Sequence, residues 1–142
     1  MTANGMPASS FAASAACAPP TGNLVPLLHE IRHALTRWLE QGEEHVIDLR
    51  SIPLAPGEED RLLEQLGAGE VNARLSILGP SDIIETRYPG AWLITHYNEN
   101  ESIIGRFIEV CEVPGILKSQ ADDIRAGLER LKDQLSNAET TA

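Results

Sequence analysis

The segment HEIRH, residues 29–33, carries the clearest chemical signal in the sequence. His29 and His33 are four residues apart, so on a helix both imidazoles would lie on one face, with Glu30 beside them. In the H-E-x-x-H arrangement, two histidines bind zinc and the glutamate acts as a general base. A zinc protease also needs a third ligand and a substrate cleft, and 142 residues are few for that architecture. The segment gives one hypothesis, a small metal-dependent enzyme; the alternative is that the histidines border the solvent side of a helix.

Cys111 is the other residue type with reactive chemistry. A nucleophilic cysteine needs a base within hydrogen-bond reach, for which His96 and Glu109 are the candidates. The simpler interpretation is that Cys111 is a small buried hydrophobic residue in a strand. Cys17 is the other cysteine of the sequence, so an iron–sulfur carrier would require a dimer that brings two copies of Cys111 together.

Aromatic residues gather in the segment ETRYPGAWLITHYNENE, residues 85–101, which holds Tyr88, Trp92 and Tyr97. Between the first two, Pro89-Gly90 predicts a type II turn, because proline presets one central position and glycine supplies a positive φ at the next. Trp and Tyr are frequent anchors of protein interfaces, and a corner would present them at the end of a sheet. Ordinary packing in the core and at the sheet edge is the alternative role for these rings.

The charge balance argues against two classes of partner. The chain has 21 Asp plus Glu against 11 Lys plus Arg, a net charge of −10. A field of this sign repels nucleic-acid phosphates and anionic membrane surfaces, and it attracts basic protein surfaces. No apolar run approaches the length of a membrane span, and the first twenty residues lack the basic residue and the apolar block of an export signal. We therefore expect a cytoplasmic protein that binds neither nucleic acid nor membrane.

Hydrophobic periodicity predicts the elements that must position these residues. Three helices are predicted over residues 24–39, 58–66 and 117–135, and Gly42 and Gly67 are placed to end the first two. The runs that predict strands lie at residues 46–49, 71–77, 83–88, 91–97 and 103–113. This order predicts an α+β fold with a mainly antiparallel sheet of four to five strands, packed by helices on one face.

The predicted boundaries give a single domain over residues 23–136, with an unstructured leader over 1–22 and an unstructured tail over 137–142. If the last hairpin closes symmetrically about its turn, Trp92 lies opposite Phe107 and Ile94 lies opposite Gly105.

Several short segments together resemble a known family. They are GEV (69–71), IET (84–86), YPGAW (88–92), IEV (108–110) and VPGIL (113–117). In this combination the chain resembles the C-terminal conserved region of the HupH/HyaF hydrogenase expression proteins, over roughly residues 46–135. It looks more like the short HupJ-type members than the longer HupH form. The leader and the HEIRH segment fall outside this resemblance.

The resemblance implies an accessory protein or chaperone, not an enzyme, that acts in the maturation of an uptake [NiFe] hydrogenase. It implies the precursor of the iron–sulfur small subunit as the partner, together with other maturation factors. No catalytic residue, metal ligand or cofactor site carries over. The matching positions are Glu85, Pro89, Gly90, Trp92, Glu109, Val113 and Pro114.

These two lines of reasoning lead to one hypothesis about the binding site. Trp92 and Tyr88, displayed at the Pro89-Gly90 corner, would anchor the partner, while acidic surroundings steer a basic segment, such as a twin-arginine leader, towards it. The candidate partner-binding residues are Glu85, Tyr88, Pro89, Gly90, Trp92 and Glu109.

Overall fold

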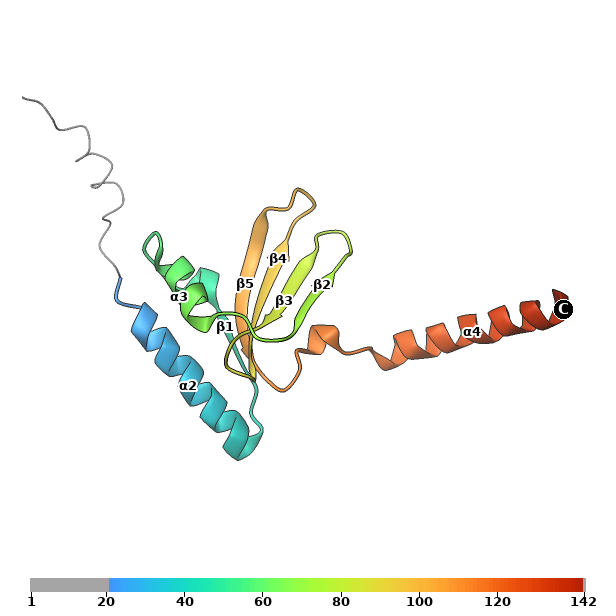
Figure 1. Ribbon diagram of the computed structural model, residues 1–142, viewed down its shortest axis with the longest axis horizontal. Coiled ribbons are helices and arrows are strands. Elements are labelled where there is room, and N and C mark those ends of the chain that lie inside the picture. The colour runs from blue at the N-terminus through green and yellow to red at the C-terminus, as the bar shows by residue number, and fades with distance from the viewer. Residues whose placement is uncertain (1–20, 142) are drawn as a thin grey trace, which may run out of the picture. The chain divides into compact units, whose positions relative to one another are not determined.

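The computed structural model describes residues 21–141, so the leader expected over residues 1–22 lies almost wholly outside it (Figure 1). The chain divides into two compact units, one that ends at Glu112 and one that begins at Val113. The elements of the first unit are α2 (Leu24–Gln41), β1 (His45–Asp48), the 3-10 turn η1 (Leu49–Ser51), α3 (Glu58–Leu66), β2 (Asn72–Leu75), β3 (Ser81–Glu85), β4 (Ala91–Tyr97) and β5 (Ile103–Val110). The predicted order of elements and the α+β class are confirmed.

The two helices of the first unit end at glycines with positive φ. Gly42 is left-handed, with φ 68° and ψ 19°, and its N–H donates to the carbonyl oxygen of Trp38 at 2.8 Å, which closes the last turn of α2. Gly67 ends α3 with φ 63° and an extended ψ of −163°, and its N–H donates to the carbonyl oxygen of Leu63 at 2.9 Å. Glycine is needed at both positions because a Cβ is strained at positive φ.

The first turn of α3 holds a buried carboxylate. Glu58 is 2% exposed. It accepts hydrogen bonds from the Thr21 hydroxyl, from the Thr21 N–H at 3.1 Å and from the Ala55 N–H at 2.7 Å. The Thr21 hydroxyl, followed by the Ala55 N–H, lowers the pKa of Glu58 below its ordinary value, because these bonds favour the charged form. Glu58 thus ties the start of the described chain to the start of α3.

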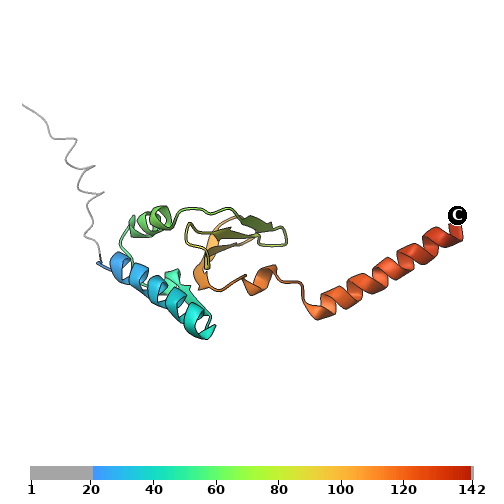
Figure 2. The same cartoon turned by 60° about the horizontal axis from the view of Figure 1, so that its bottom comes forward.

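The five strands form one antiparallel sheet in the order β1-β5-β4-β3-β2. The last four strands follow one another as a meander, and β1 pairs with the outer side of β5. Figure 2 shows the sheet close to edge-on, with α2 and α3 at the β1 side. The sheet therefore has two edge strands, β1 and β2, and each is four residues long.

One face of the sheet packs against both helices. Ile47, Ile108 and Leu93 lie side by side across β1, β5 and β4, so their side chains share this face. The core is completed by residues of α2, η1, α3 and β4: Leu27, Ile31, Leu49, Leu62, Leu66 and Ala91. The prediction of helices packed on one face is confirmed for α2 and α3.

The predicted register of the β4–β5 hairpin is wrong by two residues. Trp92 lies opposite Glu109, Ile94 opposite Phe107, and His96 opposite Gly105. The register shifts between His96 and Tyr97, because Ile104 is an extra residue on β5 between the partners of those two positions. The hairpin turn also departs from symmetry, since Glu101 adopts a positive φ of 62°.

Strand β2 is shorter than the predicted run 71–77, and its centre is charged. Arg74 lies 3.2 Å from a carboxylate oxygen of Asp82 on β3 and 3.7 Å from one of Glu101. The loop after β2 turns at Gly79, with φ 70°, and leaves Ile77 and Leu78 exposed.

The second unit contains the 3-10 turn η2 (Gly115–Leu117) and α4 (Ala121–Thr141). The helix predicted from residue 117 begins at Ala121, because Lys118 is extended at φ −85° and ψ 133°. It continues through residues 137–141, where the sequence predicts an unstructured tail. No residue of α4 is buried.

Leu62 tests the importance of the packing between α3 and the sheet. Its side chain is fully buried, so Leu62→Ala leaves a cavity and is expected to lower the free energy of unfolding by about 3 kcal/mol. Leu78→Ala, at a leucine that is 84% exposed, is the matched control and is expected to change it by less than about 0.5 kcal/mol. Urea denaturation followed by circular dichroism measures both. Equal losses in the two variants would contradict this description of the core.

Candidate functional site

The connection between β3 and β4 is a rigid corner at residues 86–91. The Ala91 N–H donates to the Tyr88 carbonyl at 2.9 Å and Gly90 has φ 95°, which gives the type II turn predicted from Pro89-Gly90. Inside the corner, the buried hydroxyl of Thr86 donates to the Ala91 carbonyl at 2.8 Å and accepts the Tyr88 N–H at 3.2 Å. The backbone of the corner is thus held by side-chain as well as main-chain bonds.

Backbone hydrogen bonds attach this corner to its neighbours. The Arg87 N–H donates to the carbonyl of Leu66, the last residue of α3, at 2.8 Å. The Cys111 N–H donates to the Gly90 carbonyl at 3.0 Å, directly after β5. A Cβ on Gly90 would lie 3.2 Å from Leu35 Cδ2, so glycine at this position allows α2 to approach the corner closely.

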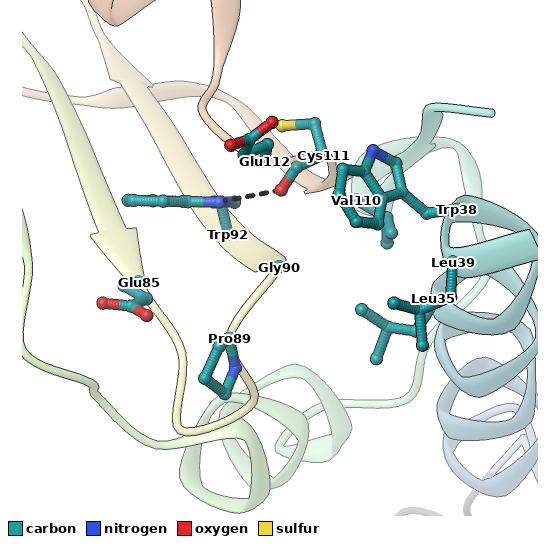
Figure 3. Close-up of a pocket in the computed structure, with 10 residues that line it drawn as sticks. All are labelled: Leu35, Trp38, Leu39, Glu85, Pro89, Gly90, Trp92, Val110, Cys111 and Glu112. Carbon is teal, nitrogen blue, oxygen red and sulfur yellow. Dashed lines mark hydrogen bonds between the residues drawn. The ribbon is translucent and has the colours of Figure 1, made fainter. Parts of the chain in front are cut away.

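An apolar groove of about 450 Å³ lies between this corner and the C-terminal half of α2 (Figure 3). Figure 3 shows Leu35, Trp38 and Leu39 on α2 at one side and the corner with the ends of β4 and β5 at the other. We call it the α2–corner groove; its lining residues are Leu35, Trp38, Leu39, Glu85, Pro89, Gly90, Trp92, Val110, Cys111 and Glu112. Two of these, Glu85 and Glu112, are carboxylates. The groove therefore suits an apolar segment that also carries positive charge.

A second hollow of about 430 Å³ lies on the α3 side of α2, and Tyr88 lines it. Leu35 and Leu39 line both this hollow and the α2–corner groove. Leu39 is 78% exposed and Tyr88 is 46% exposed. Leu39 therefore lies where a partner on either hollow would contact it, and Tyr88 lies where a partner on the second hollow would.

The structure brings five of the six candidate partner-binding residues to these two hollows. Glu85, Pro89, Gly90 and Trp92 line the groove, and Tyr88 lines the hollow beside it. Trp92 is 6% exposed, and its indole N–H donates to the Cys111 carbonyl at 3.3 Å. Its ring is therefore a buried wall of the groove and not a displayed anchor.

Glu109 is the sixth candidate, and it does not line either hollow. It lies beside Trp92 in the register of β4 and β5 and is partly buried. Burial, and next the negative charge of Glu44, raise the pKa of Glu109 above its ordinary value. The charge of His96 lowers this pKa, and its effect is the smallest of the three. The charged form of Glu109 is therefore disfavoured by the folded state.

In the HEIRH segment of α2, Ile31 is buried in the core and the other four residues are exposed. The imidazoles of His29 and His33 are 6.3 Å apart, centroid to centroid, and Glu30 contacts Nε2 of His45 at 2.8 Å. Within residues 21–141, no group of three or more His, Cys, Asp or Glu side chains is arranged to hold a metal ion. The metal-enzyme hypothesis thus lacks a third ligand in the described part of the chain.

Cys111 is buried at 2% exposure, directly after the end of β5. Its backbone, through the bonds to Gly90 and Trp92, contributes to the wall of the groove. This placement matches the simpler interpretation of Cys111 as a small buried residue.

The α2 side of the groove was missed by reasoning from the sequence. The periodicity predicts a helix over residues 24–39 but does not show how far its apolar stripe is buried, and the last buried residue of α2 is Ala34. Leu35 and Trp38 are half-buried and Leu39 is exposed. The signal in the sequence was the length of the apolar stripe, which continues for about one helical turn beyond Ala34.

Comparison with known proteins places the chain among hydrogenase expression proteins. A family model described as HupH hydrogenase expression protein, C-terminal conserved region, matches residues 22–138. The hydrogenase expression/formation protein HupH of Rhizobium leguminosarum bv. viciae is 30% identical over 132 residues, which are 92% of this chain and 45% of that protein. The protein HoxQ of Azotobacter vinelandii is 29% identical over 113 residues, 78% of this chain and 40% of that protein.

A solved structure has the same fold. The hydrogenase expression protein HupH from Thiobacillus denitrificans is 40% identical, with a TM-score of 0.79 over 83% of this chain and 98% of that one. The chain spans less than half the length of the two sequence relatives above. The matched region begins at residue 22, so it includes α2 and the HEIRH segment, which the resemblance over residues 46–135 had left out.

The raised pKa of Glu109 predicts a pH-dependent effect of its replacement. Above the raised folded pKa the carboxylate is charged in both the folded and the unfolded state, and its charge opposes folding, so Glu109→Gln is expected to stabilise the protein there. As the pH falls through the raised folded pKa and below the ordinary carboxyl pKa, both states become protonated and the difference should vanish. Denaturation of both proteins across this pH range measures the effect. A gain that is the same at acidic and neutral pH would contradict the assigned cause.

Proposed function

The chain belongs to the HupH hydrogenase expression protein family, and we propose that it is a cytoplasmic accessory protein for the maturation of a hydrogenase. Its partner in this proposal is the precursor of the hydrogenase small subunit, held in the α2–corner groove before export. The observation that carries the proposal is this groove, which is apolar, lined by two carboxylates and part of the region that the family shares. The proposed action is binding, without a catalytic residue.

The composition of the groove supports an exported precursor as the occupant. An apolar lining with Glu85 and Glu112 matches a segment in which basic residues adjoin an apolar stretch, as in a twin-arginine leader. The net charge of −10 favours encounter with such a segment over encounter with acidic surfaces. Within residues 21–141, no helix is long and apolar enough to cross a membrane.

We infer different roles for the residues of the proposed site from their exposure and charge. Leu39 and Tyr88, which are exposed, would contact the partner, and their side chains are the expected centres of binding energy. Trp92 would support the groove from behind, because its ring is buried and its N–H bond holds the residue after β5. Glu85 and Glu112 would act on the basic part of the partner.

Leu39→Gln and Tyr88→Ala test this site. The small-subunit precursor, with its leader attached, is coexpressed with the tagged chain and recovered by affinity purification. Each variant is expected to weaken capture by about tenfold, because Leu39 lines the groove and Tyr88 lines the hollow directly beside it, so each loses an exposed apolar contact with the partner. The matched control is Leu78→Gln, which removes a leucine of similar exposure. Leu78 precedes β3, at the end of that strand opposite to the corner.

Two outcomes would overturn the proposal. One is recovery of equal amounts of precursor by the groove variants, the control and the unaltered chain. The other is failure of the unaltered chain to capture the precursor at all. A precursor without its leader shows which part of the precursor binds. Loss of capture of this shortened precursor would assign the binding segment to the leader.

The role of the two carboxylates of the groove in capturing the precursor can be tested independently. Glu85→Gln and Glu112→Gln are expected to slow association with the precursor and to reduce its dependence on salt, because they remove charge that attracts basic residues. Surface plasmon resonance at several ionic strengths measures both effects. Unchanged association rates and salt dependence would show that the acidic lining plays no part in capture.

A further inference from the structure

Helix α4 carries an apolar stripe with a strict seven-residue repeat. Its members are Ala121, Ile124, Leu128, Leu131, Leu135 and Ala138, which are alternately three and four residues apart along the 21 residues of the helix. With Ala121 at position a and Ile124 at position d, they are the a and d positions of three heptads. The four large members are about half exposed, at 58%, 49%, 52% and 54%.

The stripe differs from that of a helix that packs on a sheet. In α2, adjacent apolar residues such as Leu27 with Leu28 and Ala34 with Leu35 make a wide face that covers the core. In α4 the large apolar residues occupy only a and d positions, and this narrow seam is typical of two helices that pair along their length. In proteins, most of the stability of a helix comes from packing of its apolar face against other elements.

The polar side of α4 makes ion pairs within the helix. Arg125 lies 2.6 Å from Asp122, and Lys132 lies 3.2 Å from Glu129, in both cases between residues three positions apart. Of the positions that flank the seam, the e positions are charged and the g positions are uncharged. Position g is Gln120, Gly127 or Gln134, and position e is Arg125, Lys132 or Glu139.

We propose that α4 forms a parallel coiled coil with α4 of a second copy of this chain. In a parallel pair, each e position meets the g position of the preceding heptad on the other helix, so the basic residues meet Gln120 and Gly127 without repulsion. In an antiparallel pair with the same a and d layers, Arg125 of one copy would lie beside Lys132 of the other, twice, and like charges there are unfavourable. In-register parallel pairing also sets equal side chains against each other, with alanine at both ends and leucine or isoleucine between.

Sedimentation velocity of the full chain over a range of concentrations tests the pairing. The unaltered chain is expected to show a concentration-dependent dimer. Leu131→Glu places a charge in the seam at a central d position and should weaken dimerisation by about tenfold or more. Ala126→Glu adds the same charge at the outer f position and should leave it unchanged. An unaltered chain that stays monomeric at every concentration, or a dimer that Leu131→Glu leaves intact, would overturn the proposal.

Folding of the first unit provides the control on Leu131→Glu. Its urea denaturation should match that of the unaltered chain once measurements are made at a concentration where both are monomeric. If Leu131→Glu fails to fold, Leu128→Gln, which removes apolar contact at an a position without adding charge, replaces it with the same expected direction.

Disulfide trapping tests the orientation of the helices. Ala121→Cys, in a chain that also carries Cys17→Ser, places a thiol at the first a position. In a parallel pair the two thiols face each other and should form an intermolecular disulfide on mild oxidation. In an antiparallel pair they would be about 25 Å apart and should not. Ala126→Cys on the outer face is the matched control. Trapping of Ala126→Cys as readily as Ala121→Cys, or of neither, would contradict a parallel pair.

Discussion

The hydroxyl of Thr86 bonds the carbonyl oxygen of Ala91 at 2.8 Å, and the geometry of the α2–corner groove depends on this contact. It closes the corner across which α3, β3, β4 and the residue after β5 are joined by backbone hydrogen bonds. A threonine that is 1% exposed holds this bond away from competing water. The corner can therefore present Tyr88 and Pro89 at fixed positions, although both are exposed.

The two walls of the groove differ in how many hydrogen bonds hold them in place. The corner is held by main-chain and side-chain bonds, whereas the α2 wall consists of half-buried and exposed apolar side chains past the last core residue, Ala34. Such side chains can change rotamer on contact with a partner at low cost. A surface of this kind suits a protein that binds an immature partner transiently, because one wall fixes the register and the other adapts to the bound segment.

Local signals in the sequence predicted much of the fold. Gly42 and Gly67 end their helices, and Pro89-Gly90 forms a type II turn, because the conformations of glycine and proline are restricted or permitted whatever lies around them. The register of the β4–β5 hairpin could not be predicted, because it depends on the extra residue at Ile104 and the positive φ of Glu101. The exposure of the site residues also could not be predicted from the local sequence. The Trp92 indole donates to the carbonyl of Cys111, nineteen positions away, and Leu39 is 78% exposed although it belongs to the apolar stripe of α2.

The charged, short β2 edge has a consequence for resistance to aggregation. Extended segments of other chains can add to any open sheet edge. Here β1 and β2 each offer only four residues, and Arg74 in β2 is held by Asp82 and Glu101. An edge this short, with an ion-paired charge in it, is a poor template for further strands. The sheet can thus remain a scaffold for the groove without drawing extended segments of other chains, or copies of itself, into aggregates.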